Sequence, residues 1–132
     1  MIVAGVGFRR NVAADEIVSL VERALACAGL ANNALGGLAT VEALAARPAF
    51  IEAARRLSVT TTSIEDQALI EAAPHARTQS ARSLAAHGVG SVAEAAALAS
   101  CGAGAELILE RIASPAATCA LARTITPSET GP

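Results

Sequence analysis

The chain has 132 residues, 53% hydrophobic and 17% charged, which suits one domain with its own core and excludes intrinsic disorder. All ten cationic residues are arginines and the formal net charge is −2, so Schiff-base lysine chemistry is excluded and neither nucleic acid nor a membrane surface is favoured as a partner. No apolar run approaches the roughly 20 residues of a membrane span and no secretion signal is visible, so we expect a cytoplasmic protein.

The first half of the chain alternates predicted strands with predicted helices. Apolar residues follow one another in residues 2–6 and 35–41, and β-branched residues fill 59–62, so we expect three strands. Apolar residues recur at helical spacing in 15–28, and Gly29 then ends that helix. We expect a second helix from Pro48 and a third that runs through Ile70 and ends before Pro74, opened by a capping box of Ser63 and Asp66.

The second half adds a capped helix and a hairpin. Residues 80–87 predict a short helix, and Ser91 with Glu94 forms a capping box that opens a helix to about Ser100. Residues 107–109 and 118–122 predict an antiparallel hairpin. We therefore expect an α/β fold, a three-layer α/β/α sandwich around a mixed, mostly parallel sheet, with one domain over residues 1–125 and a flexible tail at 126–132.

Three cysteines, Cys27, Cys101 and Cys119, are odd in number and widely spaced. Because they contain no C-x-x-C pair, neither a disulfide framework nor a metal site is predicted. We expect all three to be buried free thiols, since unpaired cysteine is among the residue types most often buried.

The segment GVGFRRN, residues 5–11, follows the first strand like a dinucleotide loop. Gly5 and Gly7 supply two of the three glycines of that motif, but Arg10 stands in place of the third, which disfavours a pyrophosphate. The loop still predicts an anion site, in which helix-start amides, Arg9 and Arg10 bind a carboxylate or phosphate and Asn11 supports the turn. The alternative is that one arginine pairs with an acidic residue, at position 15 or 16, of the next helical turn.

Two further clusters precede helices. Gly88 and Ser91, with His87 before them, form a loop whose amides suit an anion and whose side chains suit proton transfer. The alternatives are structural roles: Ser91 serves only as the cap of the helix that follows it, and His87 is only the last residue of the predicted helix before it. Thr40 and Glu42 follow the second strand, where ligands of open α/β sheets bind; the alternatives are an N-cap role for Thr40 and solvent exposure for Glu42.

These clusters occur in a familiar order. GVGFRRN, ADEI, LATVE, GVGSVAEAAAL and TCALAR span nearly the whole chain, and together they resemble the CobE family of cobalamin-biosynthesis proteins, also found as the C-terminal domain of CbiG-type proteins. The chain departs from that pattern at residues 11–13, where Asn-Val-Ala replaces a hydroxyl-bearing Gly-Thr-Ser, and at 43–46, where relatives carry a lysine. A second family lysine near the final hairpin is replaced by Arg111.

The resemblance implies a cytoplasmic protein that binds or hands on a corrinoid, a macrocycle with many carboxylates, and that other cobalamin-pathway enzymes are its partners. It implies no metal site and no cofactor of its own. The alternative is a hydrolase acting on a precorrin through His87, Ser91 or Glu42, the only catalytic candidates. The predicted ligand-binding residues are Gly5, Gly7, Arg9, Arg10, Asn11, Thr40, Glu42, Gly88 and Ser91.

Overall fold

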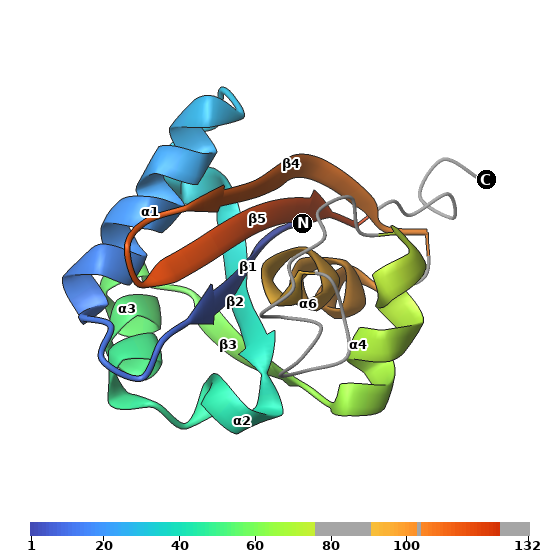
Figure 1. The fold of residues 1–132 in the computed structure, drawn as a ribbon. Coiled ribbons are helices and arrows are strands. Elements are labelled where there is room, and N and C mark those ends of the chain that lie inside the picture. Colours follow the sequence, from blue (N-terminus) through green and yellow to red (C-terminus); the bar gives the residue numbers. More distant parts are fainter. Residues whose placement is uncertain (76–90, 103, 125–132) are drawn as a thin grey trace.

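The computed structural model describes residues 1–75, 91–102 and 104–124, which form three layers with a five-stranded sheet in the middle (Figure 1). The strands are β1 (Ile2–Phe8), β2 (Leu35–Val41), β3 (Thr60–Ile64), β4 (Glu106–Ala113) and β5 (Ala117–Arg123). The helices are α1 (Ala14–Cys27), α2 (Glu42–Ala45), α3 (Pro48–Leu57), α4 (Asp66–Ala72) and α6 (Val92–Cys101), with 3-10 turns η1 (Asn32–Ala34) and η2 (Ala73–His75).

The sheet has the order β3-β2-β1-β5-β4. The neighbours β1, β2 and β3 are parallel, whereas β5 runs antiparallel to both β1 and β4. This confirms the predicted mixed sheet with a C-terminal hairpin. Because Phe8 at the end of β1 pairs with Ala117 at the start of β5, the turn between β4 and β5 lies next to the carboxyl end of β1.

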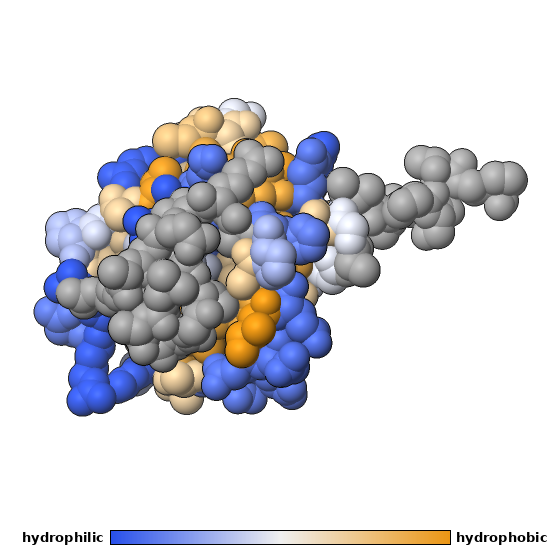
Figure 2. Space-filling view, turned by 45° about the vertical axis from the view of Figure 1, so that its right-hand side comes forward, coloured by the Kyte–Doolittle hydropathy of each residue, from blue (hydrophilic) through white to orange (hydrophobic). Residues whose placement is uncertain are grey.

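Helices cover both faces of the sheet and enclose two apolar clusters. On one face α1 and α3 contribute Ile17, Leu20 and Phe50, and on the other α4 and α6 contribute Leu69 and Leu98. Apart from Phe50, the buried core side chains are aliphatic or small, and Phe50 stacks on Phe8, the other aromatic ring of the chain, with ring centroids 6.0 Å apart. On the face shown in Figure 2, hydrophobic residues form limited areas among hydrophilic ones.

Local patterns predicted most positions of the α-helices and strands, with two exceptions among the described residues. Ser63 is the fourth residue of β3 rather than a cap, because the run of β-branched residues continues as strand, and α4 begins at Asp66 after the N-cap Glu65. The short helix α2 was not predicted. Cys101 and Cys119 are buried as expected, but Cys27 is exposed at the end of α1, so that expectation is wrong for one thiol of three.

The predicted helix at 80–87 and the predicted tail at 126–132 lie outside the described residues. Within the described ranges, no helix is both long enough and apolar enough to cross a membrane.

Candidate anion-binding site

The loop after β1 presents two arginines at the carboxyl end of the sheet. Arg9, Arg10 and Asn11 are exposed, while Val12 is buried and anchors the loop in the apolar cluster beneath α1. The N-cap of α1 is Ala13, and no side chain caps its first amides. A 14-residue helix thus begins shortly after the two exposed arginines, without a side-chain cap and with Asp15 and Glu16 in its first turn.

Neither arginine forms the ion pair that we considered as the alternative. Asp15 instead pairs with Arg56 of α3, with 2.6 Å between Oδ1 and Nη1. Glu16 accepts hydrogen bonds from the β4–β5 turn. In the part of the chain that the structure describes, Arg9 and Arg10 make no salt bridge, so both guanidinium groups are open to a ligand.

Glu16 fixes the arginine loop through one residue of the hairpin turn, Ala116. The Ala116 N–H donates to Glu16 Oε2 at 2.6 Å, and the Ala116 carbonyl accepts from the Arg9 N–H at 2.8 Å. The Ser114 hydroxyl donates to the same Glu16 oxygen. This clamp joins the first turn of α1, the hairpin and the start of the loop, and nothing in the spacing of the sequence predicted it.

Because the clamp uses the Glu16 carboxylate, we expect the stability of the fold to depend on pH. The hydrogen bonds from Ser114 and then Ala116 lower the pKa of Glu16 below its usual value. A carboxyl whose pKa is lower in the folded state adds stability above its unfolded pKa, about 4.3 for Glu, and loses that contribution as the pH falls through the folded value. We expect Glu16→Gln to lower the stability at pH 7, with the difference from wild type vanishing in acid.

Urea unfolding followed by far-ultraviolet circular dichroism from pH 7 to about pH 2 measures this difference. Glu110→Gln, at an exposed glutamate of β4, is the matched control and should follow the wild-type profile. An equal stability of Glu16→Gln and wild type at pH 7 would contradict the clamp.

Thr40 is a structural residue of the sheet. Its side chain is fully buried, and Oγ1 donates to the Val6 carbonyl at 2.7 Å, which ties the ends of β1 and β2 together. The proposed N-cap role is wrong, because the N-cap of α2 is Val41 and no side chain caps that helix. Glu42 is exposed as the first residue of α2, at the same end of the sheet as the arginine loop (Figure 1).

Gly5 and Gly7 allow α6 to lie directly on β1. A Cβ at Gly5 would stand 2.0 Å from the Ala93 carbonyl oxygen and 2.5 Å from the Ala97 nitrogen, a distance that no side chain tolerates. A Cβ at Gly7 would meet Thr118 Oγ1 at 3.0 Å. The close packing of α6 on β1 therefore explains both glycines without any ligand. The same contact places the start of α6 next to the end of β1.

Ser91 caps α6 as predicted. Its Oγ accepts from the Glu94 N–H at 3.2 Å, and both side chains are fully buried. The Glu94 carboxylate accepts from the Arg111 N–H at 2.9 Å, in the stretch where the β4–β5 register is irregular. Glu94 thus connects α6 to β4, a contact that the capping-box pattern did not predict. The other candidates of this loop, His87 and Gly88, lie outside the described residues.

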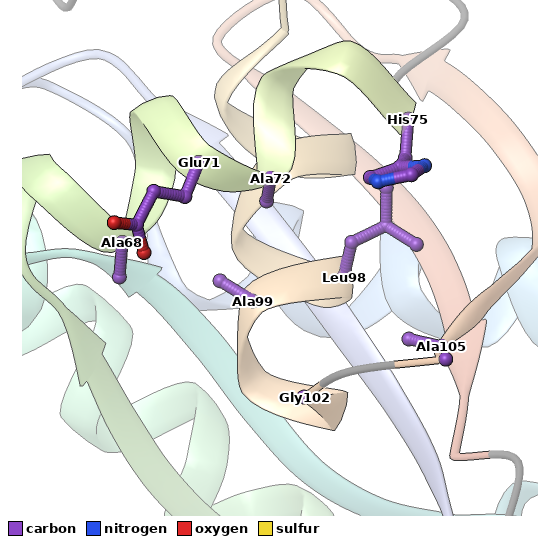
Figure 3. Close-up of a pocket in the computed structure, with 9 residues that line it drawn as sticks. Ala68, Glu71, Ala72, His75, Leu98, Ala99, Gly102 and Ala105 are labelled. Carbon is purple, nitrogen blue, oxygen red and sulfur yellow. The ribbon is translucent and has the colours of Figure 1, made fainter.

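A separate pocket of about 380 Å³ opens between α4, η2, the end of α6 and the residues that lead from α6 into β4 (Figure 3). Glu71 and His75 are the only ionisable side chains among its described lining residues. Because Leu98 and Gly102 at the end of α6 line it, it lies at the opposite end of this helix from Ser91. None of the predicted site residues that the structure describes lines it, and no cluster of potential metal ligands occurs in the described ranges.

Comparisons of the sequence and of the structure with known proteins agree on one family. The family model described as cobalamin synthesis G C-terminus matches residues 2–122. Protein CobE of Sinorhizobium sp is 40% identical over 122 residues, which cover 92% of this chain and 79% of that protein.

Two solved structures share the fold. The crystal structure of CobE, a protein of the cobalamin biosynthetic pathway, has a TM-score of 0.89 and 32% identity, covering 96% of this chain and 92% of that one. The cobalamin biosynthesis protein chiG of Agrobacterium tumefaciens has a TM-score of 0.76 and 33% identity, covering 96% and 100%. The chain therefore belongs to the cobalamin synthesis G C-terminal family, together with CobE, and is a protein of cobalamin biosynthesis.

Proposed function

We propose that the chain binds a corrinoid intermediate through its peripheral carboxylates and hands it on to another enzyme of the pathway. The observation that carries this proposal is the exposed pair Arg9 and Arg10, which has no acidic partner among the described residues. A guanidinium group binds a carboxylate through two parallel hydrogen bonds, and two neighbouring groups suit a ring with several acidic side chains.

The surroundings of the pair favour a carboxylate over a dinucleotide. The start of α1 has no side-chain cap, and the acidic residues of its first turn, Asp15 and Glu16, are already engaged by Arg56 and by the hairpin turn. The glycines that would serve a pyrophosphate are used instead at the contact between β1 and α6. Thr40 donates its hydroxyl within the sheet, so the arginines and the exposed Asn11 are the polar groups that this loop offers to a ligand.

The hydrolase alternative has weaker support in the described part of the chain. Ser91 is buried and caps α6, so its hydroxyl is not presented to a substrate. Glu42 is exposed on α2, and among the described residues it makes no hydrogen bond or ion pair with a side chain that could share a catalytic role. Binding without turnover is therefore the function that the geometry supports best.

Gel filtration of the protein with a cobalt corrin that carries free side-chain carboxylates tests this proposal. The chain has no Trp or Tyr, so the absorption of the pigment reports the ligand with little protein background. We expect the pigment to elute with the protein and to keep its spectrum. The fully methyl-esterified corrin is the matched control and should elute free.

Elution of the carboxylate form free of the protein would contradict binding. A changed pigment spectrum with turnover would instead favour the hydrolase.

A further inference from the structure

The two edges of the sheet differ in how they are protected from pairing with another strand. The edge strand β4 has two register irregularities against β5, and it carries Glu106, Glu110 and Arg111. The other edge strand, β3, pairs with β2 in regular register and contains neither a charge nor a proline. Charges, prolines and bulges are the usual means of keeping an edge strand unpaired, and β3 has none of them.

The side chains of β3 leave this edge accessible on both faces of the sheet. Its first four residues, Thr-Thr-Thr-Ser at 60–63, are exposed, and only Ile64 is buried. Since successive residues of a strand point to opposite faces, the exposure of all four positions leaves both faces of the sheet accessible at this edge. β-branched threonines favour the extended strand, and threonine pairs across neighbouring strands are favourable.

Charges at the two ends of β3 indicate the direction in which a second strand would pair. Arg55 lies in the last turn of α3, five residues before the strand; its side chain is 71% exposed and pairs with Glu52 of the same helix. The exposed acidic residues Glu65 and Asp66 follow the strand directly. A second copy of β3 in the antiparallel direction brings its Glu65 and Asp66 toward the Arg55 end of the first strand and gives Arg55 acidic neighbours besides Glu52, whereas a parallel copy would place the two acidic ends together.

The helices on either side of β3 carry exposed isoleucines. Among the described residues, the exposed large hydrophobic side chains are Met1, Ile51 of α3 and Ile70 of α4, the latter two 51% and 49% exposed. Arg56 of α3 reaches Asp15 of α1, and Ile51, five residues earlier, lies about 140° around the helix, on the flank away from α1. Ile70 does not line the pocket between α4 and α6, in which Ala68 and Glu71 lie (Figure 3).

We propose that two copies of this chain associate through antiparallel pairing of β3 with β3 about a two-fold axis at Thr62. Such an axis stands perpendicular to the sheet, so the two sheets join into one and each face of the first continues as the same face of the second. The helix α3 of one copy therefore lies next to α3 of the other. The same symmetry brings α4 toward the partner's α4, which covers the exposed isoleucines. The arginine loop extends β1, two strands away from β3, and stays open in this dimer.

Sedimentation equilibrium of the full chain from about 5 to about 500 μM, where a small interface associates, tests this proposal. We expect the average mass to rise from 13.1 kDa toward twice that value. Thr62→Lys places a charge at the centre of the exposed edge and should stay at the monomer mass. Glu110→Gln makes the same change of net charge at the other edge and should behave as wild type.

A wild-type mass that stays at 13.1 kDa throughout would overturn the proposal, as would a Thr62→Lys variant that associates as wild type does. Far-ultraviolet circular dichroism verifies that Thr62→Lys is folded, which its exposed position predicts.

A cross-link tests the register independently of mass. In a Cys27→Ser background, which removes the exposed thiol, Thr62→Cys should form a disulfide-linked dimer under mild oxidation because residue 62 faces its own copy. Thr60→Cys should cross-link far more slowly, because residue 60 would face residue 64 of the partner. Equal rates for the two variants would overturn the antiparallel register.

Discussion

Replacing Arg9 and Arg10 together by alanine is expected to weaken corrin binding by roughly 100-fold or more, since each charge-assisted hydrogen bond contributes about 1.5–3 kcal/mol. The fold should be unaffected, because both side chains are exposed and form no salt bridge among the described residues. Titration of the carboxylate corrin, followed by its visible absorption at several salt concentrations, measures the effect. Wild-type affinity should fall with added salt, and the variant should lose most of that dependence.

A double variant of Arg55→Ala and Arg123→Ala is the matched control. It removes the same charge from two exposed arginines that lie outside the loop, both already in salt bridges with Glu52 and Glu106. We expect it to bind the corrin as wild type does. If the control and the loop variant lose affinity equally, net charge and not the arginine pair explains binding.

Replacing Gly5 by alanine is expected to prevent stable folding. The added Cβ would lie 2.0 Å from the Ala93 carbonyl oxygen and 2.5 Å from the Ala97 nitrogen, both backbone atoms that no rotamer change can move. We expect a loss of about 3 kcal/mol or more, a large part of the 5–15 kcal/mol that holds a domain folded. Urea unfolding followed by far-ultraviolet circular dichroism measures it.

Gly7→Ala is the control for the same strand. Its Cβ would meet the Thr118 hydroxyl at 3.0 Å, and this side chain can rotate away, so the loss should be clearly smaller. Equal stabilities of the two variants would contradict the close contact of β1 with α6.

Corrin binding and folding are separable by these two experiments. The arginine variant is expected to lose ligand and keep its stability, because Arg9 and Arg10 are exposed on a loop held by Ala116 and by buried Val12. The glycine variant is expected to lose its structure before ligand is added. These outcomes would divide the loop GVGFRRN into a half that packs against α6, with Gly5 and Gly7, and the proposed binding half, with Arg9 and Arg10.

The sequence by itself determined the local elements of this protein. The strand β2 occupies the predicted residues, α3 begins at Pro48, and Ser91 caps α6. Runs of apolar or β-branched residues, helical spacing and caps depend on neighbours within a few positions, so they can be read along the chain. The arginine pair was also found in this way, because its exposed position after a strand follows from the same patterns.

Only the tertiary structure decided which residues serve the fold and which stay open to a ligand. Thr40 and Gly5 were predicted to bind a ligand, yet Thr40 donates to Val6 and Gly5 lies under Ala93. Glu16 holds a turn 100 positions along the chain, and Glu94 holds Arg111, 17 positions away. These contacts arise from the order of strands in the sheet, which short-range patterns do not contain, because distant segments meet only when the layers pack.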